Sequence, residues 1–249
     1  CKQKTAYGIS ECDWSSDVCS SDLWKQYVDY LTNVIFHFDF GPSFKFKDRT
    51  VNDIIAQGFP VTLTYGFWSF IVAVIFGVGL GVTAAIRHNT WLDYLSVGFA
   101  IGSQSIPNYV MAPILVLVFT LWLGWLPGGG WEGGTWDHII MPVIALSTSY
   151  FASIARITRS SMLEVLNSGF IRTAKAKGLP MSRVILKHAL KPALLPVLSY
   201  LGPAFVGMVT GSVIIDQYFS TGGIGQFFVN SAFNRDYSTM MGITILVGT

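Results

Sequence analysis

The most conspicuous shortage in this 249-residue sequence is electric charge, because Asp, Glu, Lys and Arg together make up only 12% of it. Soluble globular chains carry about 25% of such residues. Hydrophobic residues reach 51%, and the mean hydropathy is +0.50. So few charges leave long stretches without any, which is typical of an integral membrane protein rather than of a soluble enzyme with buried helices.

Cysteine is also scarce, and its three copies, Cys1, Cys12 and Cys19, all lie near the N-terminus. The run Ile9–Leu23 is polar and rich in serine, and it resembles translated library adapter sequence. We therefore interpret residues 1–23 as a non-native segment and exclude them from the predicted fold. The remaining sequence has no cysteine, which excludes thiolate chemistry and a cysteine-ligated metal site.

The sequence has no catalytic constellation. Its four histidines are scattered, and no carboxylate pair or nucleophile motif is present. The glycine cluster Gly128–Gly134 is not a phosphate-binding loop, because such a loop needs a lysine and no Lys or Arg lies near this cluster. The uncharged stretches also lack the mid-depth ionisable residues of ion-coupled carriers. We expect a chain that is not an enzyme, has no ATP site or metal site, and binds no cofactor.

Long uncharged stretches, by contrast, are abundant. A bilayer core of about 30 Å needs about 20 apolar helical residues to cross it. The fold class expected is therefore an all-α polytopic membrane protein. The predicted transmembrane helices cover residues 60–86, 94–123, 139–155 and 193–215, and a fifth, 237–249, stops inside the membrane.

Glycine pairs spaced four residues apart occur in three of these predicted helices. This small-xxx-small spacing lets helix backbones approach each other closely in a membrane. We expect tight helix packing at Gly77 and Gly81, at Gly98 and Gly102, and at Gly207 and Gly211.

The basic residues are concentrated in one segment, residues 156–191, which we call the basic loop. It contains eight Lys or Arg and a single acid, Glu164, whereas residues 124–138 contain no Lys or Arg. Short loops rich in Lys and Arg stay in the cytoplasm. The basic loop is therefore predicted on the cytoplasmic side, and residues 24–59 on the external, periplasmic side.

The external segment has a pattern of its own. Phenylalanine alternates with polar residues over 36–40 and again over 44–47, and Gly41-Pro42-Ser43 supplies turn residues between them. This pattern predicts a small hairpin. A short amphipathic helix over Thr50–Gln57 is expected to follow it and to lead to Pro60.

The first half of the basic loop predicts a helix. Apolar residues recur at three- and four-residue spacing, which places them on one helix face: Leu163, Leu166, Phe170 and Ala174. Gly178 can adopt the left-handed conformation that ends a helix, and Pro180 prevents its continuation.

The second half predicts another helix, with Ser182 as its N-cap and an apolar face formed by Val184, Ile185, His188 and Ala189. The product is a basic helix-turn-helix under the membrane, suited to docking in a groove of another protein. The alternative is a basic amphipathic hairpin that lies on anionic lipid.

The same segment resembles a known family. The runs Arg172–Gly178, His188–Lys191 and Leu194–Pro196 resemble the conserved cytoplasmic loop of binding-protein-dependent ABC importer permeases. The resemblance is strongest to the B-type permease of oligopeptide and dipeptide systems, with Arg172-Thr173-Ala174 at the place of the usual Glu-Ala-Ala. It extends from about Trp24 to the end, through Gly41-Pro42-Ser43, Ser105-Ile106-Pro107, Gly222–Gly225 and Asn234–Tyr237.

This resemblance implies the type I ABC importer permease fold, a multi-pass location in the bacterial inner membrane, and transport of oligopeptides or dipeptides. The implied partners are a homologous permease subunit in a heterodimer, two cytoplasmic ATPase subunits that hold ATP and Mg, and a periplasmic or lipid-anchored solute-binding protein. No nucleic acid is implied. Family members have six spans, so the sequence is expected to be truncated at both ends.

The resemblance also implies roles for single residues. Loop 163–191 would transmit ATP-driven closure to the spans, with Gly178 as the turn between coupling helices and Ala174 in the ATPase groove. The implied coupling residues are Arg172, Thr173, Ala174, Lys175, Lys177, Gly178 and Leu190. Polar residues within the predicted spans are candidates for the translocation path: Gln104, Asn108, Ser147, Ser149 and Thr210.

Two alternative functions stay open. The first is an importer permease of the same family for nickel or another solute. The second, from a different class, is an ion-coupled carrier or passive channel whose basic loop only rests on lipid.

Overall fold

A computed structural model describes residues 19–43, 45, 49–210 and 213–248 of the chain. It divides into two compact units, one formed by Cys1–Phe59 with Phe227–Thr249 and the other by Pro60–Gln226. The described residues form helices joined by turns, with one isolated antiparallel bridge between Pro42 and Thr50.

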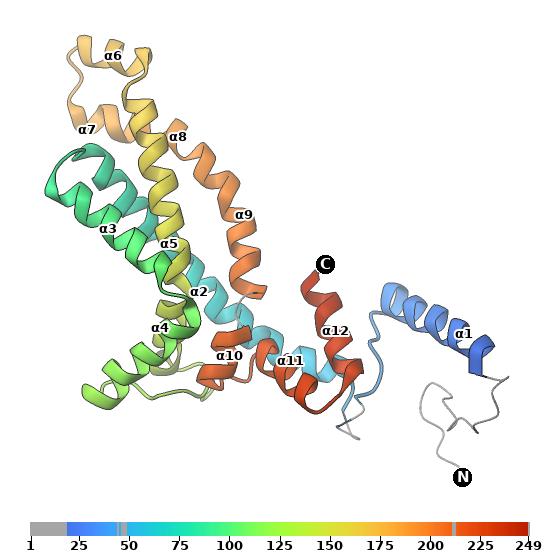
Figure 1. Ribbon diagram of the computed structural model, residues 1–249. Coiled ribbons are helices and arrows are strands. Elements are labelled where there is room, and N and C mark those ends of the chain that lie inside the picture. The colour runs from blue at the N-terminus through green and yellow to red at the C-terminus, as the bar shows by residue number, and fades with distance from the viewer. Residues whose placement is uncertain (1–18, 44, 46–48, 211–212, 249) are drawn as a thin grey trace. The chain divides into compact units, whose positions relative to one another are not determined.

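Three helical stretches are long and apolar enough to cross a membrane. They are α2 (Val51–Ile86), α5 (Trp136–Leu166) and the stretch Leu195–Phe219, which comprises α9 (Leu195–Thr210) and α10 (Val213–Phe219). A bent pair of helices adds a fourth candidate span (Figure 1). The predicted all-α membrane fold is confirmed.

The predicted span 94–123 is not one helix. Helix α3 (Trp91–Ser105) stops before Pro107, and α4 (Asn108–Leu115) and a π-helix, η2 (Val116–Trp122), continue at an angle of 106° to it. Ile106 is extended, with φ −91° and ψ 113°. A residue before proline is pushed out of the helical region by the proline ring, which explains the break.

Helix α2 also corrects a prediction. The short helix Thr50–Gln57 and the span 60–86 form one continuous helix with Pro60 inside it. A proline in a helix removes one backbone hydrogen bond and favours a kink, but neighbouring apolar packing can keep the helix going. Ile54 and Val61, on either side of Pro60, are both buried.

Helix α5 is the central element of the unit Pro60–Gln226. The helices α3, α4 and α9 pack against it (Figure 1). The main apolar core of the unit gathers around it, and its fully buried members include Tyr65, Met141, Leu146, Ile154 and Met208. The predicted span 139–155 is thus only the middle of a helix that continues into the basic loop.

A buried carboxylate organises the end of this unit opposite the basic loop. Asp216 on α10 is fully buried, and Thr62 on α2 donates a hydrogen bond to it at 3.2 Å. Thr221 donates another at 3.0 Å, and the amide of Gly225 a third at 2.9 Å. Side-chain and backbone donors from three elements thus converge on one acid, which fixes the Thr221–Gly225 turn against α2.

In the other unit, α1 (Cys19–Thr32), the π-helix η1 (Asn33–His37), the start of α2 and α12 (Tyr237–Gly248) are described. Residues 1–18, most of the segment interpreted as adapter, lie outside the described part. Val34, Phe40 and Val51 form the small core of this unit.

The predicted hairpin, with its turn at Gly41–Ser43, is wrong, and a different antiparallel contact is found in its place. Residues up to His37 are helical, and the antiparallel contact joins Gly41–Ser43 to Arg49–Val51 instead. Val51 N–H donates to the Gly41 carbonyl at 2.9 Å, and Ser43 N–H to the Arg49 carbonyl at 3.3 Å. Because Pro42 has no N–H, its neighbours Gly41 and Ser43 make these hydrogen bonds. The residues that were expected to form the turn therefore form one arm of the antiparallel contact. Residues 44 and 46–47 of the predicted second strand lie outside the described residues.

Candidate functional site

The basic loop contains four short helical elements after α5 ends. They are α6 (Gly169–Ala176), α7 (Met181–Arg183), the π-helix η3 (Val184–Ala189) and α8 (Leu190–Ala193). The helix-turn-helix arrangement predicted from the sequence is therefore present, but its boundaries differ.

The first predicted helix of the loop is divided in two. Helix α5 ends at Leu166, and Ser168, extended with φ −70° and ψ 157°, precedes α6. Asn167 closes α5 with backbone bonds to the carbonyls of Leu163 and Glu164. Asn and Ser favour such helix ends because their side chains compete for backbone groups, and this outweighs the continuous apolar stripe.

The turn at Gly178 agrees with its prediction. Gly178 has φ +76°, and its N–H donates to the Lys175 carbonyl at 3.0 Å. The N-cap of the second helix is Pro180 and not Ser182 as predicted. The Pro180 carbonyl accepts a hydrogen bond from the Arg183 N–H at 3.0 Å. Proline suits this position, since its missing N–H would have no helical partner there.

One face of the loop is buried within its own chain. Ile171, Ala174, Val184 and Ala189 pack with Met162 of α5 in a compact apolar cluster, which also includes Ala85 of α2. Ala174, expected in the groove of an ATPase, is therefore an internal packing residue in this structure. Leu190 is half-buried.

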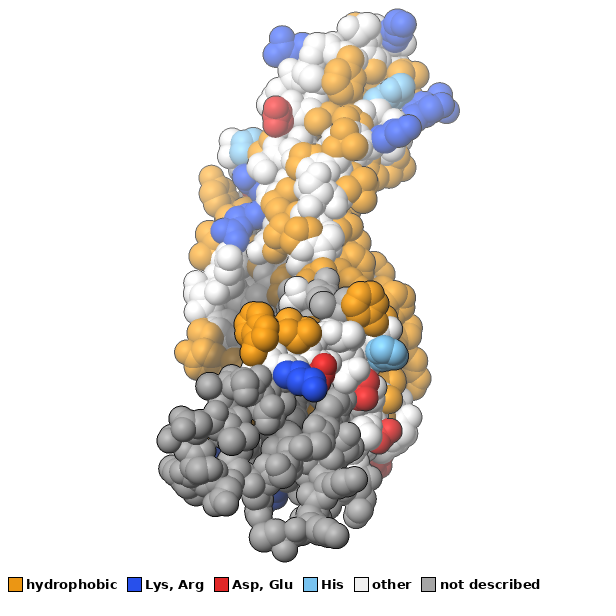
Figure 2. Space-filling model, turned by 90° about the vertical axis from the view of Figure 1, so that its right-hand side faces the viewer, with side chains coloured by type: hydrophobic (Ala, Val, Ile, Leu, Met, Phe, Trp, Pro, Cys, Tyr) orange, Lys and Arg blue, Asp and Glu red, His pale blue; other side chains and the backbone are white. Residues whose placement is uncertain are grey.

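The opposite surface is apolar in places and strongly basic. Three large apolar side chains of the loop are exposed: Phe170 (53%), Met181 (45%) and Leu186 (68%). Figure 2 shows Lys and Arg side chains gathered at this end of the molecule. The exposed basic residues of α6 to α8 are Arg172, Lys175, Lys177, Arg183, Lys187 and Lys191.

The predicted translocation-path residues do not lie together in the structure. Ser147 lines a largely apolar cavity of about 660 Å³ between α2, α3, α4 and α5, together with Ser103 and Thr148. Gln104 accepts a hydrogen bond from Arg156, and Ser149 is half-buried on α5. Thr210 is half-buried at the end of α9, and the side chain of Asn108 lies outside the described part of the chain.

Three polar residues were missed by the sequence-based prediction. Asp93 at the start of α3 pairs with Arg159 near the end of α5, and Asp216 forms the cluster with Thr62, Thr221 and Gly225 described above. A charge at the end of a membrane span needs a partner, so Asp93 and Arg159 could have been flagged individually. Among the described residues, no three His, Cys, Asp or Glu side chains meet where they could hold a metal ion.

Comparison with known proteins gives one matching family model. Residues 77–249 match the model described as binding-protein-dependent transport system inner membrane component.

Several curated relatives are similar over most of the chain. The oligopeptide transport system permease protein OppB of Salmonella typhimurium is 60% identical over 226 residues, which cover 91% of this chain and 74% of that protein. The protein of the same name in Escherichia coli K12 is 59% identical over the same shares. The dipeptide permease protein DppB of Bacillus subtilis is 44% identical over 88% of this chain and 70% of its own.

The fold is similar to solved permease structures. An inward-facing MetNI methionine ABC transporter gives a TM-score of 0.64 at 18% identity, covering 79% of this chain and 90% of its own. An amino acid ABC transporter gives 0.62 at 16% identity, covering 79% and 86%. At this identity the likeness concerns the fold alone.

Proposed function

The chain belongs to the family of binding-protein-dependent transport system inner membrane components, and we propose that it is the permease subunit of an ABC importer that moves oligopeptides. The observation that carries the cargo class is the 60% identity to an oligopeptide permease over 91% of the chain. Its place is the bacterial inner membrane, which several of its helices are long enough to cross.

Energy enters through partner subunits in this proposal. Two cytoplasmic ATPase subunits hold ATP and Mg, a homologous permease completes the pathway, and a binding protein delivers peptide from outside. The chain itself contributes the surface on which an ATPase acts. The exposed part of the basic loop supports this role, because exposed apolar surface that is rimmed by polar residues is typical of interaction sites.

The docking surface we propose consists of Phe170, Met181 and Leu186, with basic side chains around them. Apolar anchors in a desolvated centre carry most of the binding energy at interfaces, and charges at the rim mainly steer the approach. Arg172, Lys175 and Lys177 belong to this rim. Ala174 supports the surface from beneath, because it is buried among residues of its own chain.

The turn at Gly178 sets the relation between the two halves of this surface. A Cβ atom added to Gly178 would have no other atom within 4 Å. Only the backbone conformation, with φ +76°, therefore restricts which residue can occupy this position. A left-handed conformation costs a non-glycine residue about 1–2 kcal/mol, least for Asn and most for β-branched residues.

The test compares Gly178→Val with Gly178→Asn in the assembled importer. We expect Gly178→Val to lower ATP-dependent uptake of a labelled oligopeptide at least tenfold while its membrane level stays normal. Gly178→Asn should retain most of the uptake. Gly133→Val is the matched control, because Gly133 also has a positive φ, +71°, and open space, yet lies in the predicted external loop. Normal uptake by Gly178→Val would refute the coupling role of the loop.

A further inference from the structure

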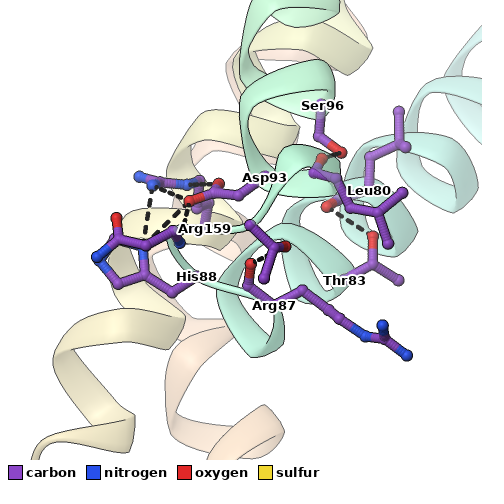
Figure 3. Close-up of polar contacts among 10 residues, drawn as sticks. Leu80, Thr83, Arg87, His88, Asp93, Ser96 and Arg159 are labelled. Atoms are coloured by element: carbon purple, nitrogen blue, oxygen red, sulfur yellow. Dashed lines mark hydrogen bonds and ion pairs between the residues drawn. The ribbon is translucent and has the colours of Figure 1, made fainter.

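An ion pair whose carboxylate is buried joins two helices at the start of the basic loop. Asp93, in the first turn of α3, is only 2% exposed, and Arg159 of α5 binds it with two nitrogens (Figure 3). Arg159 Nε lies 2.6 Å from Asp93 Oδ1, and Nη2 lies 2.8 Å from Oδ2. Two parallel bonds between a guanidinium and a carboxylate fix direction as well as distance.

The turn between α2 and α3 is held by the same carboxylate. His88 Nδ1 lies 3.1 Å from Asp93 Oδ2, and the N–H of Asn89 donates to that oxygen at 3.1 Å. His88 Nδ1 also lies 3.3 Å from Arg159 Nη2. Asp93 therefore ties three parts of the molecule together: the end of α2, the start of α3 and the side of α5.

The pair lies where α5 enters the basic loop. Arg159 precedes the end of α5 at Leu166 by about two helical turns. Between them lies Met162, which is fully buried in the apolar cluster of the loop. Ala85, in the last turn of α2, belongs to the same cluster. The polar and the apolar contact thus join the same two helices, and only the polar contact includes α3.

The two kinds of contact differ in what they transmit. Burial of apolar side chains stabilises a contact but has no preferred direction. A bidentate pair with a buried carboxylate has one favourable geometry, and separating its members leaves a charge without its partner. A displacement of α5 by the loop is therefore passed to α2 and α3 most rigidly through Asp93 and Arg159.

We propose that Asp93 and Arg159 are positioning residues for energy coupling, which make α5 and the α2–α3 turn move as one body with the basic loop. The proposal rests on the permease function stated above. Without this pair, the ATPases could still displace the loop, but α2 and α3 would not follow fully. Hydrolysis would continue while transport fell.

The test measures the ATP hydrolysed per labelled oligopeptide taken up by the assembled importer. We expect Asp93→Asn and Arg159→Gln to raise this ratio at least fivefold, with intact subunit assembly. Arg159→Lys keeps the charge but loses the bidentate geometry. The ratio of ATP hydrolysed to oligopeptide taken up by this variant should therefore lie between the wild-type value and the values of Asp93→Asn and Arg159→Gln. The control is Arg87→Gln, because the exposed Arg87 side chain leaves the same turn but points away from Asp93 (Figure 3).

A second measurement needs no variant. Hydrogen exchange at Arg87–Asp93 in the wild-type importer should change when ATP and vanadate trap the ATPases. An unchanged exchange there would overturn the proposal even if the variants failed to assemble. The proposal would also be overturned if oligopeptide uptake and ATP hydrolysis fell in equal proportion in the variants. Equal losses are expected if the pair only stabilises the fold. Failure of the permease function is distinct, because the wild type itself would then show no ATP-dependent oligopeptide uptake.

Discussion

Gly81 of α2 lies directly against Thr158 of α5. A Cβ added to Gly81 would come within 2.5 Å of the Thr158 Cβ and 2.6 Å of the Ala155 carbonyl oxygen. One turn earlier, a Cβ on Gly77 would lie 2.7 Å from the Ile154 side chain. These two glycines let α2 and α5 approach more closely than any larger residues would allow.

Gly81→Ala should therefore destabilise the protein. Overpacking of a filled contact costs about 1–3 kcal/mol, which exceeds the gain of about 0.5–1 kcal/mol from alanine in a helix. The matched control is Gly79→Ala on the same helix, where a Cβ meets nothing within 4 Å and the stability should not fall. Thermal unfolding of the detergent-purified protein distinguishes them, and equal midpoints would contradict the close contact.

Thr158 itself offers a second test. Its hydroxyl is buried and has no hydrogen-bond partner among the described residues. Replacing a buried unsatisfied hydroxyl by a methyl group removes a desolvation penalty of about 1–3 kcal/mol. Thr158→Val should raise the unfolding midpoint.

Thr148→Val on the same helix is the comparison for this test. The Thr148 hydroxyl donates to the Ile144 carbonyl at 2.6 Å, so the variant loses a bond of about 1 kcal/mol. The two variants should shift the midpoint in opposite directions. A lower midpoint for both would mean that Thr158 has a partner after all.

The sequence predicts the number and place of most membrane helices because hydropathy is summed over about 20 residues, so single exceptions do not alter it. Helix ends are less well predicted, since they depend on few residues. The break before Pro107 follows from a local rule that a count of apolar residues does not include. At Asn167 and Ser168, the cap preference outweighs the apolar stripe.

Pairing between distant residues was not predictable from patterns. Asp93 and Arg159 are 66 positions apart, and nothing in the local sequence of either identifies the other. The glycine spacing has the same limit. Gly77 and Gly81 face a helix, whereas Gly98 and Gly102 have no atom of the described chain near their Cβ positions. The spacing indicates a small-residue face, but only tertiary packing decides whether a neighbour covers it.

The buried acid Asp216 should hold the Thr221–Gly225 turn in place. Asp216→Ala would leave the Thr62 and Thr221 hydroxyls and the Gly225 amide without this acceptor, at a cost of about 1–3 kcal/mol for each unsatisfied group. Hydrogen exchange at Thr221–Gly225 should therefore accelerate at least tenfold. Gln217→Ala, an exposed neighbour, should leave it unchanged. Equal exchange in both variants would contradict the role of the carboxylate.

The exposed apolar residues of the basic loop should govern binding of the ATPase subunits. Leu186→Asp removes an anchor and adds a charge, and loss of such an anchor costs about 2 kcal/mol or more, at least thirtyfold in affinity. Phe233→Asp, an equally drastic change of an exposed residue on α11 (Ile224–Phe233), serves as control. Co-purification of the ATPases with each variant measures the effect. Normal recovery with Leu186→Asp would exclude Leu186 from the docking surface.

We propose above that this chain moves oligopeptides with energy supplied by ATP on partner subunits. The most direct measurement is accumulation of a labelled oligopeptide in proteoliposomes that contain the assembled importer and its binding protein. We expect accumulation that requires hydrolysable ATP on the side of the ATPases and that persists when a protonophore removes the ion gradient. Accumulation that occurs without ATP and that the protonophore abolishes would contradict ATP-driven transport.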